Sequence, residues 1–257
     1  MTTAAGAPAA VPAEGWGSRE NARSYADFAR SSGWYRRLAA DLVRRIDCRA
    51  LNRVIDLCAG TGVLTRELLP LVPPGCRILA IDASRAMLAQ AVRETQDGRV
   101  DWCCSRAEAC ARFGPGMIDA VLCSAALWET SVPAVLIGVR TLLRPGGRFV
   151  FNLGPAAAPC WAMYEKAMLA TDFTVDNVEP VSYELTVGQA DQWLSLPAFA
   201  AAGPPDRVRA ADGDRGGEPV RSTAKDPTAI LRAPWVVVSA TAGTTQILST
   251  LETTFET

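Results

Sequence analysis

Four residues in the first third of the chain have types and a spacing that suit the binding of a nucleoside. Asp56 lies near the end of the apolar run RVIDLC, and Gly60 and Gly62 follow in the turn before the next helical segment. Glycine in such a turn lets the backbone approach a ligand closely. Asp82 ends a second apolar run, where a carboxylate can accept both hydroxyls of a ribose. In a parallel sheet these residues converge on one crevice at the carboxyl ends of the strands.

The elements that must position these residues alternate between apolar runs and helical segments. The expected strands are 53–58, 78–82, 99–104, 118–125 and 148–154. Helical segments of about ten residues separate most of these strands, and Ser84 is the expected N-cap of one of them. The pattern predicts an α/β fold with a doubly wound, mostly parallel sheet flanked by helices, N-terminal helices, and a small irregular lobe after the fifth strand.

The composition of the remaining segments predicts how the chain is divided. Ala, Pro and Gly dominate the N-terminus, and Gly, Pro and charged residues dominate a stretch near residue 210. The expected divisions are a disordered tail (1–17) and one domain (18–257), which comprises a helical cap (18–47), a cofactor-binding core (53–154), a substrate lobe (155–230) with a flexible loop (201–227), and closing strands (231–257).

The composition also excludes several kinds of function. The 257 residues include 26 basic and 27 acidic groups, which argues against a nucleic-acid partner. No histidine is present, which excludes Ser-His-Asp hydrolysis and His-ligated zinc, and we expect no metal site. The eight cysteines form no CxxC pair, so we expect free thiols in a cytoplasmic protein. No apolar stretch reaches the roughly 18 residues of a membrane span, so we expect no membrane partner.

The turn itself argues against a dinucleotide. A pyrophosphate prefers G-x-G-x-x-G without a preceding acid, whereas here Asp56 precedes the turn and Cys58 replaces the first glycine. An acid at this position suits a cationic ligand. With its surroundings, the segment Val54 to Gly62 resembles the motif of class I methyltransferases, which use S-adenosylmethionine.

The resemblance covers about residues 20 to 154 and implies S-adenosyl-L-methionine as the cofactor. In that family the motif holds the methionine part, the acid after the second strand holds the ribose, and residues after the third strand contact the adenine. Ser105 to Glu108 stand there without the family's acid, and the turn Leu143 to Gly147 matches the family's turn before strand five. The cofactor-binding residues implied are Tyr25, Asp56, Ala59, Gly60, Gly62, Asp82, Ala83, Met87, Arg106, Ala107 and Ser124.

The expected reaction is methyl transfer to nitrogen, carbon or an acidic oxygen of a small molecule, in specialised metabolism. Asn152 and Tyr164 are the polar side chains expected at the reacting centre. Aromatic residues of the lobe are expected to hold the acceptor: Trp161, Tyr164, Tyr183, Trp193 and Phe199. Transfer or cyclisation of the cofactor's aminocarboxypropyl arm, a polyketide cyclase, and a catalytically inactive cofactor-binding module stay open as alternatives. The sequence leaves the oligomeric state open.

Overall fold

A single seven-stranded sheet organises the molecule. In this computed structural model the described residues are 16–155, 157–198 and 226–244. The strand order is β3-β2-β1-β4-β5-β7-β6. The strands are β1 (Arg53–Leu57), β2 (Arg77–Asp82), β3 (Val100–Cys104), β4 (Ile118–Cys123), β5 (Leu143–Leu153), β6 (Phe173–Thr186) and β7 (Ile230–Ala242). Strands β1 to β5 are parallel and β7 runs antiparallel to both β5 and β6, so the expected α/β fold with a mostly parallel sheet is confirmed.

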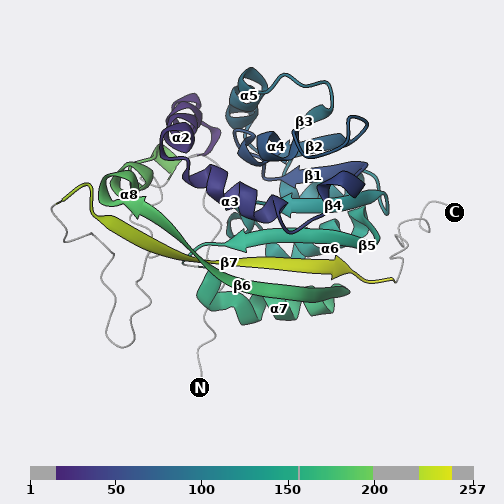
Figure 1. Cartoon of the computed structure of the whole chain (residues 1–257). Helices are drawn as coiled ribbons and strands as arrows, with labels where there is room; N and C mark the ends of the chain where they lie inside the picture. Colours follow the sequence, from purple (N-terminus) through teal and green to yellow (C-terminus); the bar gives the residue numbers. More distant parts are fainter. Residues whose placement is uncertain (1–15, 156, 199–225, 245–257) are drawn as a thin grey trace, which may run out of the picture.

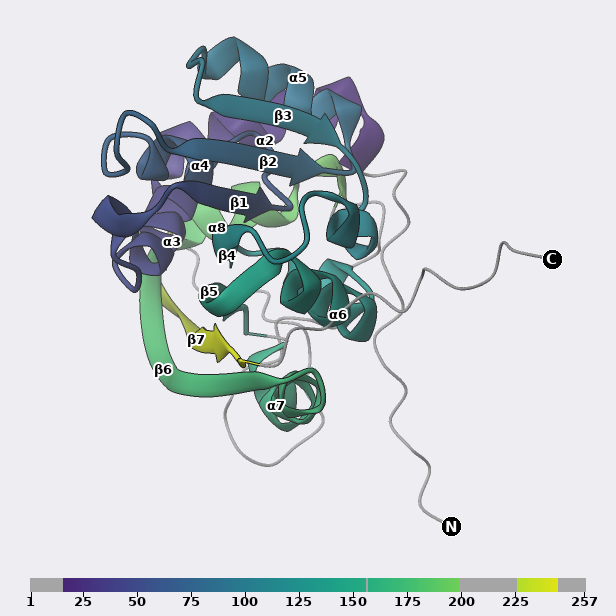
Figure 2. The same ribbon diagram turned by 90° about the vertical axis from the view of Figure 1, so that its right-hand side faces the viewer.

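Helices cover both faces of the sheet (Figures 1 and 2). They are α2 (Arg19–Ser32), α3 (Trp34–Val43), α4 (Val63–Leu68), α5 (Arg85–Glu94), α6 (Val132–Leu142), α7 (Trp161–Ala170) and α8 (Val187–Leu194). One face packs its apolar residues against α3 and α4, and the other packs against α6 and α7. The strands β1, β2 and β4 are buried on both sides, which explains their nearly continuous apolar sequences.

Two helices, α2 and α3, precede the sheet in the chain. The Ser18 side chain accepts a hydrogen bond from the backbone N–H of Asn21 and so begins α2. Gly33 has φ +61° and ends it, because glycine adopts the left-handed region without steric cost. Figure 1 shows α2 and α8 side by side beyond the end of the sheet to which the parallel strands point, so both lie near the crevice.

Two features differ from the sequence-based expectation. Residues 173–186, within the expected lobe, form the edge strand β6, which pairs with β7 from Phe173 to Thr186 with an irregularity between Val175 and Asn177. Trp16, within the expected tail, accepts a hydrogen bond from Ser84 Oγ on its carbonyl and packs its ring against Tyr25. Residues 1–15 of that tail, residues 201–225 of the expected loop and residues 245–257 of the closing segment lie outside the described residues. No helix in the described ranges is long and apolar enough to cross a membrane.

Candidate cofactor site

Asp56 lies at the base of the crevice, near the end of β1. Its side chain is buried, with 1% of its surface exposed, and Oδ2 accepts a hydrogen bond of 2.6 Å from Thr65 Oγ1 on α4. Burial raises the pKa of Asp56 to about 7, and the Thr65 hydrogen bond opposes that shift. A buried carboxylate with one polar partner retains acceptor capacity, so Asp56 can receive a cationic group of a ligand.

The glycine turn after β1 adopts conformations that favour glycine. Gly60 has φ +55° and Gly62 has φ +78°. A Cβ on Gly62 would lie 2.7 Å from the Trp102 ring, whereas a Cβ on Gly60 would meet no atom within 4 Å. The open space beside Gly60 is what a backbone cradle for a ligand requires. Arg66 Nη1 donates to the Thr61 carbonyl at 2.8 Å and fixes the turn from behind.

Asp82 connects the end of β2 to the glycine turn. Its Oδ2 accepts the backbone N–H of Gly60 at 2.8 Å, and its Oδ1 accepts the backbone N–H of Ser84 at 2.8 Å. Burial raises the pKa of the Asp82 carboxyl, and the two backbone hydrogen bonds lower it. Each carboxylate oxygen can accept a second hydrogen bond, as two ribose hydroxyls require.

The residues expected around the adenine differ in exposure. Met87 and Ala107 are buried, with 3% and 6% of their surface exposed, and Ala83 and Arg106 are exposed. The Arg106 guanidinium forms an ion pair of 3.3 Å with Glu108. The guanidinium of Arg106 is therefore paired at the surface. Only its backbone and the aliphatic part of its side chain are left for the expected contact with the adenine.

Tyr25 and Tyr35 bring the N-terminal cap over this crevice. Their ring centroids are 4.7 Å apart, and both side chains line a cavity together with Asp56, Cys58, Ala59, Val63, Leu64 and Ser124. The cavity measures about 20 Å³, which is room for one water molecule. A methionine group requires more space than this cavity offers.

A second polar junction lies at the end of β4. Asn152 on β5 is fully buried, and its Oδ1 accepts the backbone N–H of Ala125 at 2.6 Å. Ala125 has φ +56°, a strained conformation for a residue with a side chain. The preceding residue, Ser124, lines the cavity. Asn152 therefore holds the loop that borders the crevice.

The structure separates the two residues expected at the reacting centre. Tyr164 on α7 is 2% exposed and packs with Met168 and Phe173 in the core that α6 and α7 cover. Asn152 points to the other face, because side chains alternate along β5 and its neighbours Phe151 and Leu153 belong to the α7-side core. The expectation that Tyr164 reaches the reacting centre is corrected: Tyr164 occupies a core position.

The sequence also missed several residues that shape the crevice. Tyr35 is buried in an aromatic core cluster and also lines the cavity. Thr65, the partner of Asp56, is missed because the contact crosses nine residues. Cys58 stands at the position of the first glycine of the motif and has φ +61°, a conformation that favours glycine. The motif position therefore indicated an unusual backbone conformation at Cys58. Of the aromatic residues expected around the acceptor, Trp161 packs on the α7 side and Phe199 lies outside the described residues.

Comparison with known proteins agrees with this geometry. The family described as "Methyltransferase domain" matches residues 54–147, which run from β1 into β5 and include both acids and the glycine turn. An uncharacterized methyltransferase of Schizosaccharomyces pombe is 32% identical over 133 residues, which are 50% of this chain and 50% of that protein. The ubiquinone biosynthesis O-methyltransferase of Azotobacter vinelandii is 36% identical over 104 residues, 39% of this chain and 44% of that protein.

A solved structure extends the comparison to the whole fold. The YcgJ protein from Bacillus subtilis superposes with a TM-score of 0.60 at 16% sequence identity, covering 80% of this chain and 98% of that one. Residues 54–147 therefore match a methyltransferase domain, and the chain shares its overall fold with YcgJ. It spans about half the length of the curated relatives it matches.

Proposed function

We propose that the protein transfers the methyl group of S-adenosylmethionine to a small-molecule acceptor. The observation that carries this proposal is the pairing of Asp82 with the Gly60 backbone beside buried Asp56. Asp82 offers acceptors for ribose hydroxyls, the open space at Gly60 admits a ligand against the backbone, and Asp56 offers a negative charge for the methionine ammonium. The matched family supports the same assignment.

The cofactor supplies a sulfonium-activated methyl group: the acceptor–carbon bond forms as the carbon–sulfur bond breaks, and the electron pair stays on sulfur. The chain's own task is alignment and the exclusion of water. Tyr25 and Tyr35 line the crevice, and Asn152 accepts the backbone N–H of Ala125, next to Ser124. With no histidine in the chain, an acceptor that is already nucleophilic at neutral pH suits this site best.

The named relative acts in ubiquinone biosynthesis, which supports a small-molecule acceptor. All eight cysteines are free thiols, which supports the proposed cytoplasmic location. We assign this methyl transfer to specialised metabolism.

Product analysis tests the reaction. The protein is incubated with S-adenosylmethionine and candidate acceptors, and the cofactor-derived product is identified by mass spectrometry. S-adenosylhomocysteine is the expected product. Methylthioadenosine would instead assign aminocarboxypropyl chemistry, and cofactor binding without any turnover would favour an inactive binding module.

A further inference from the structure

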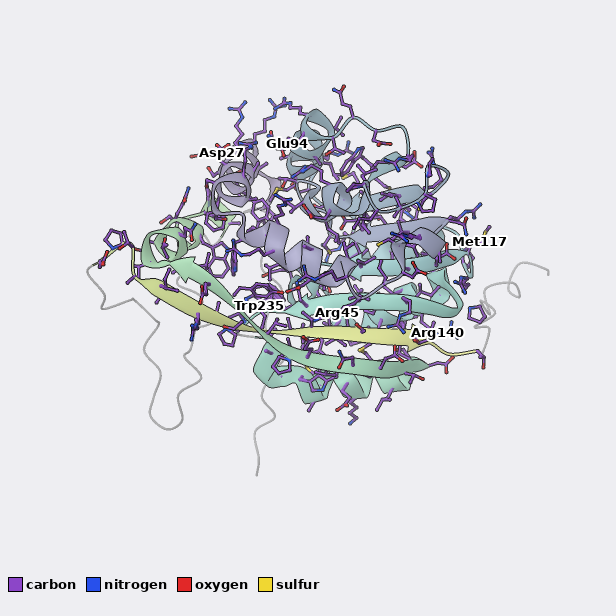
Figure 3. The ribbon with its side chains drawn as sticks, in the orientation of Figure 1. Asp27, Arg45, Glu94, Met117, Arg140 and Trp235 are labelled. Atoms are coloured by element: carbon purple, nitrogen blue, oxygen red, sulfur yellow. The ribbon has the colours of Figure 1, made fainter. Side chains whose placement is uncertain are left out.

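Six aromatic side chains next to the crevice form what is here called the aromatic cluster. Its members come from α3, the turn after β4, β6, α8 and β7, and are Trp34, Tyr35, Trp128, Tyr183, Trp193 and Trp235. The Trp34 ring centroid lies 5.1 Å from that of Trp193 and 5.7 Å from that of Trp235, both in edge-to-face geometry. Trp128 lies 5.7 Å from Trp235. Figure 3 shows Trp235 in the region where β6 and β7 pass beneath α3.

The aromatic cluster is continuous with the cofactor crevice. Tyr35 belongs to the cluster and also lines the cavity beside Asp56. Ala125 packs against the cluster, and its neighbour Ser124 lines the cavity. A Cβ on Gly154 would lie 3.3 Å from Trp235 and 3.4 Å from Trp128, so the indoles lie close to the backbone where β5 ends. A molecule held among these rings is therefore adjacent to the cofactor.

Three buried hydrogen-bond donors in and beside the cluster have no partner among the described residues. They are Trp34 Nε1, Trp235 Nε1 and Asn152 Nδ2, on side chains that are 1%, 2% and 0% exposed. Other polar groups of the cluster are satisfied: Trp193 Nε1 donates to the Tyr35 hydroxyl at 2.9 Å, and the Tyr183 hydroxyl donates to Asp41. A buried donor without an acceptor is costly, so donors left unpaired in and beside a cluster that adjoins the crevice through Tyr35 point to a ligand that supplies the acceptors.

The chemistry of these groups selects the kind of ligand. Aromatic rings in edge-to-face contact favour a flat ring system over a flexible chain. Indole and carboxamide N–H groups only donate, so they are satisfied by carbonyl, ether or phenolate oxygens. An ammonium group has no acceptor to offer, although ring faces attract cations. The three donors therefore favour an oxygen-bearing ring over an ammonium group.

We propose that the aromatic cluster, with Asn152, binds the acceptor of this enzyme, and that the acceptor is a planar ring bearing carbonyl or acidic hydroxyl oxygens. This inference rests on the proposed methyl transfer and names its substrate class. An enolic or phenolic hydroxyl conjugated to a carbonyl gives up its proton to water at neutral pH. The absence of histidine in the chain fits such an acceptor.

Calorimetric titration of the full chain tests this proposal. The probes are 2-hydroxy-1,4-naphthoquinone and 1-naphthylmethylammonium, each titrated with and without saturating S-adenosylhomocysteine. Trp235→Phe removes the N–H and keeps an aromatic ring, and Trp161→Phe is the matched control on the opposite face of the sheet. We expect the quinone to bind the wild type and Trp161→Phe equally, and to bind Trp235→Phe about three- to tenfold more weakly. We expect the ammonium probe to bind more weakly than the quinone.

The outcomes separate the two proposals. Failure of the quinone to bind in both conditions, or equal binding by Trp235→Phe, overturns the assignment of the cluster even where S-adenosylhomocysteine binds. Preferred binding of the ammonium probe overturns it too. Failure of S-adenosylhomocysteine to bind overturns the proposed methyl transfer instead. If Trp235→Phe does not fold, as judged by its thermal melt, Trp34→Phe replaces it, because it removes the other unpaired indole N–H.

Discussion

The backbone N–H of Gly60 donates to Asp82 Oδ2 at 2.8 Å, so the acid after β2 and the glycine turn after β1 form one unit. The same carboxylate also accepts from Ser84, the N-cap of α5. Asp82 thus fixes two loops of the crevice before any ligand arrives. Each of its oxygens can still accept a second hydrogen bond, as the proposed ribose contact requires.

Replacing Asp82 by Ala is expected to weaken S-adenosylmethionine binding by about 1.5 to 3 kcal/mol, the range for hydrogen bonds to charged groups. Both the ribose acceptors and the anchor for the Gly60 turn are lost. Calorimetry with wild type and variant measures the difference. An unchanged affinity would remove Asp82 from the site.

Gly60→Val is expected to abolish cofactor binding, because its side chain would occupy the open space beside the turn. The φ of +55° adds a strain of about 1–2 kcal/mol for a residue with a side chain. Gly146→Val is the matched control: Gly146 has φ +74°, also meets no atom within 4 Å, and lies within β5. The control should lose stability in a urea melt and keep its affinity. Normal binding by Gly60→Val would mean that the turn does not receive the ligand.

The buried carboxyl of Asp56 should make both stability and affinity depend on pH. Its pKa is about 7 in the folded protein against 3.8 as the reference value, so the folded state holds this proton more tightly than the unfolded state. Its contribution to stability is full below pH 3.8 and is lost as the pH rises through about 7. The free energy of unfolding of Asp56→Asn, measured in urea melts, should therefore change less than that of the wild type between about pH 5.5 and about pH 8.5. An identical pH dependence in the two proteins would contradict the raised pKa.

Cofactor affinity should show the opposite trend. The methionine ammonium requires the ionised carboxylate, so affinity in the wild type should rise with pH through about 7 and then level off. Asp56→Asn should bind weakly at every pH in the same titration. Strong binding by this variant would remove the ammonium from the neighbourhood of Asp56.

Asn152 should act on turnover through the loop at Ser124. Asn152→Leu removes the acceptor for the Ala125 N–H, so the strained loop loses its anchor, and we expect kcat to fall by about tenfold. Asn152→Asp keeps an acceptor oxygen but loses the amide donor, so kcat should recover while the acceptor KM stays raised. Steady-state kinetics with an acceptor that the wild type methylates measures kcat and the acceptor KM separately. Equal loss of kcat in both variants would leave Asn152 without a positioning role.

The core of the fold follows from the sequence because its strands are short, apolar and separated by capped helices, as β1, β2 and α5 illustrate. The edge strand β6 was not foreseen, since Asp176, Asn177 and Pro180 disfavour strands by intrinsic propensity. An edge strand tolerates them because one side of its ladder is unpaired.

Some residues of the candidate site could be predicted from the sequence and others could not. Asp56, Gly60 and Asp82 are set by local spacing along the chain and could be predicted. The aromatic cluster depends on contacts such as Trp193 with Tyr35, which lie 158 residues apart, and no local pattern encodes that distance. Tyr164 was misplaced because helical spacing on α7 does not say which face of the sheet the helix covers.

The most direct test of the central claim is calorimetric titration of the folded wild-type protein with S-adenosylmethionine and S-adenosylhomocysteine. The crevice formed by Asp56, Gly60 and Asp82 predicts that both bind at one site, with dissociation constants on the order of micromolar. Folded protein that binds neither would contradict the claim that this crevice is a cofactor site.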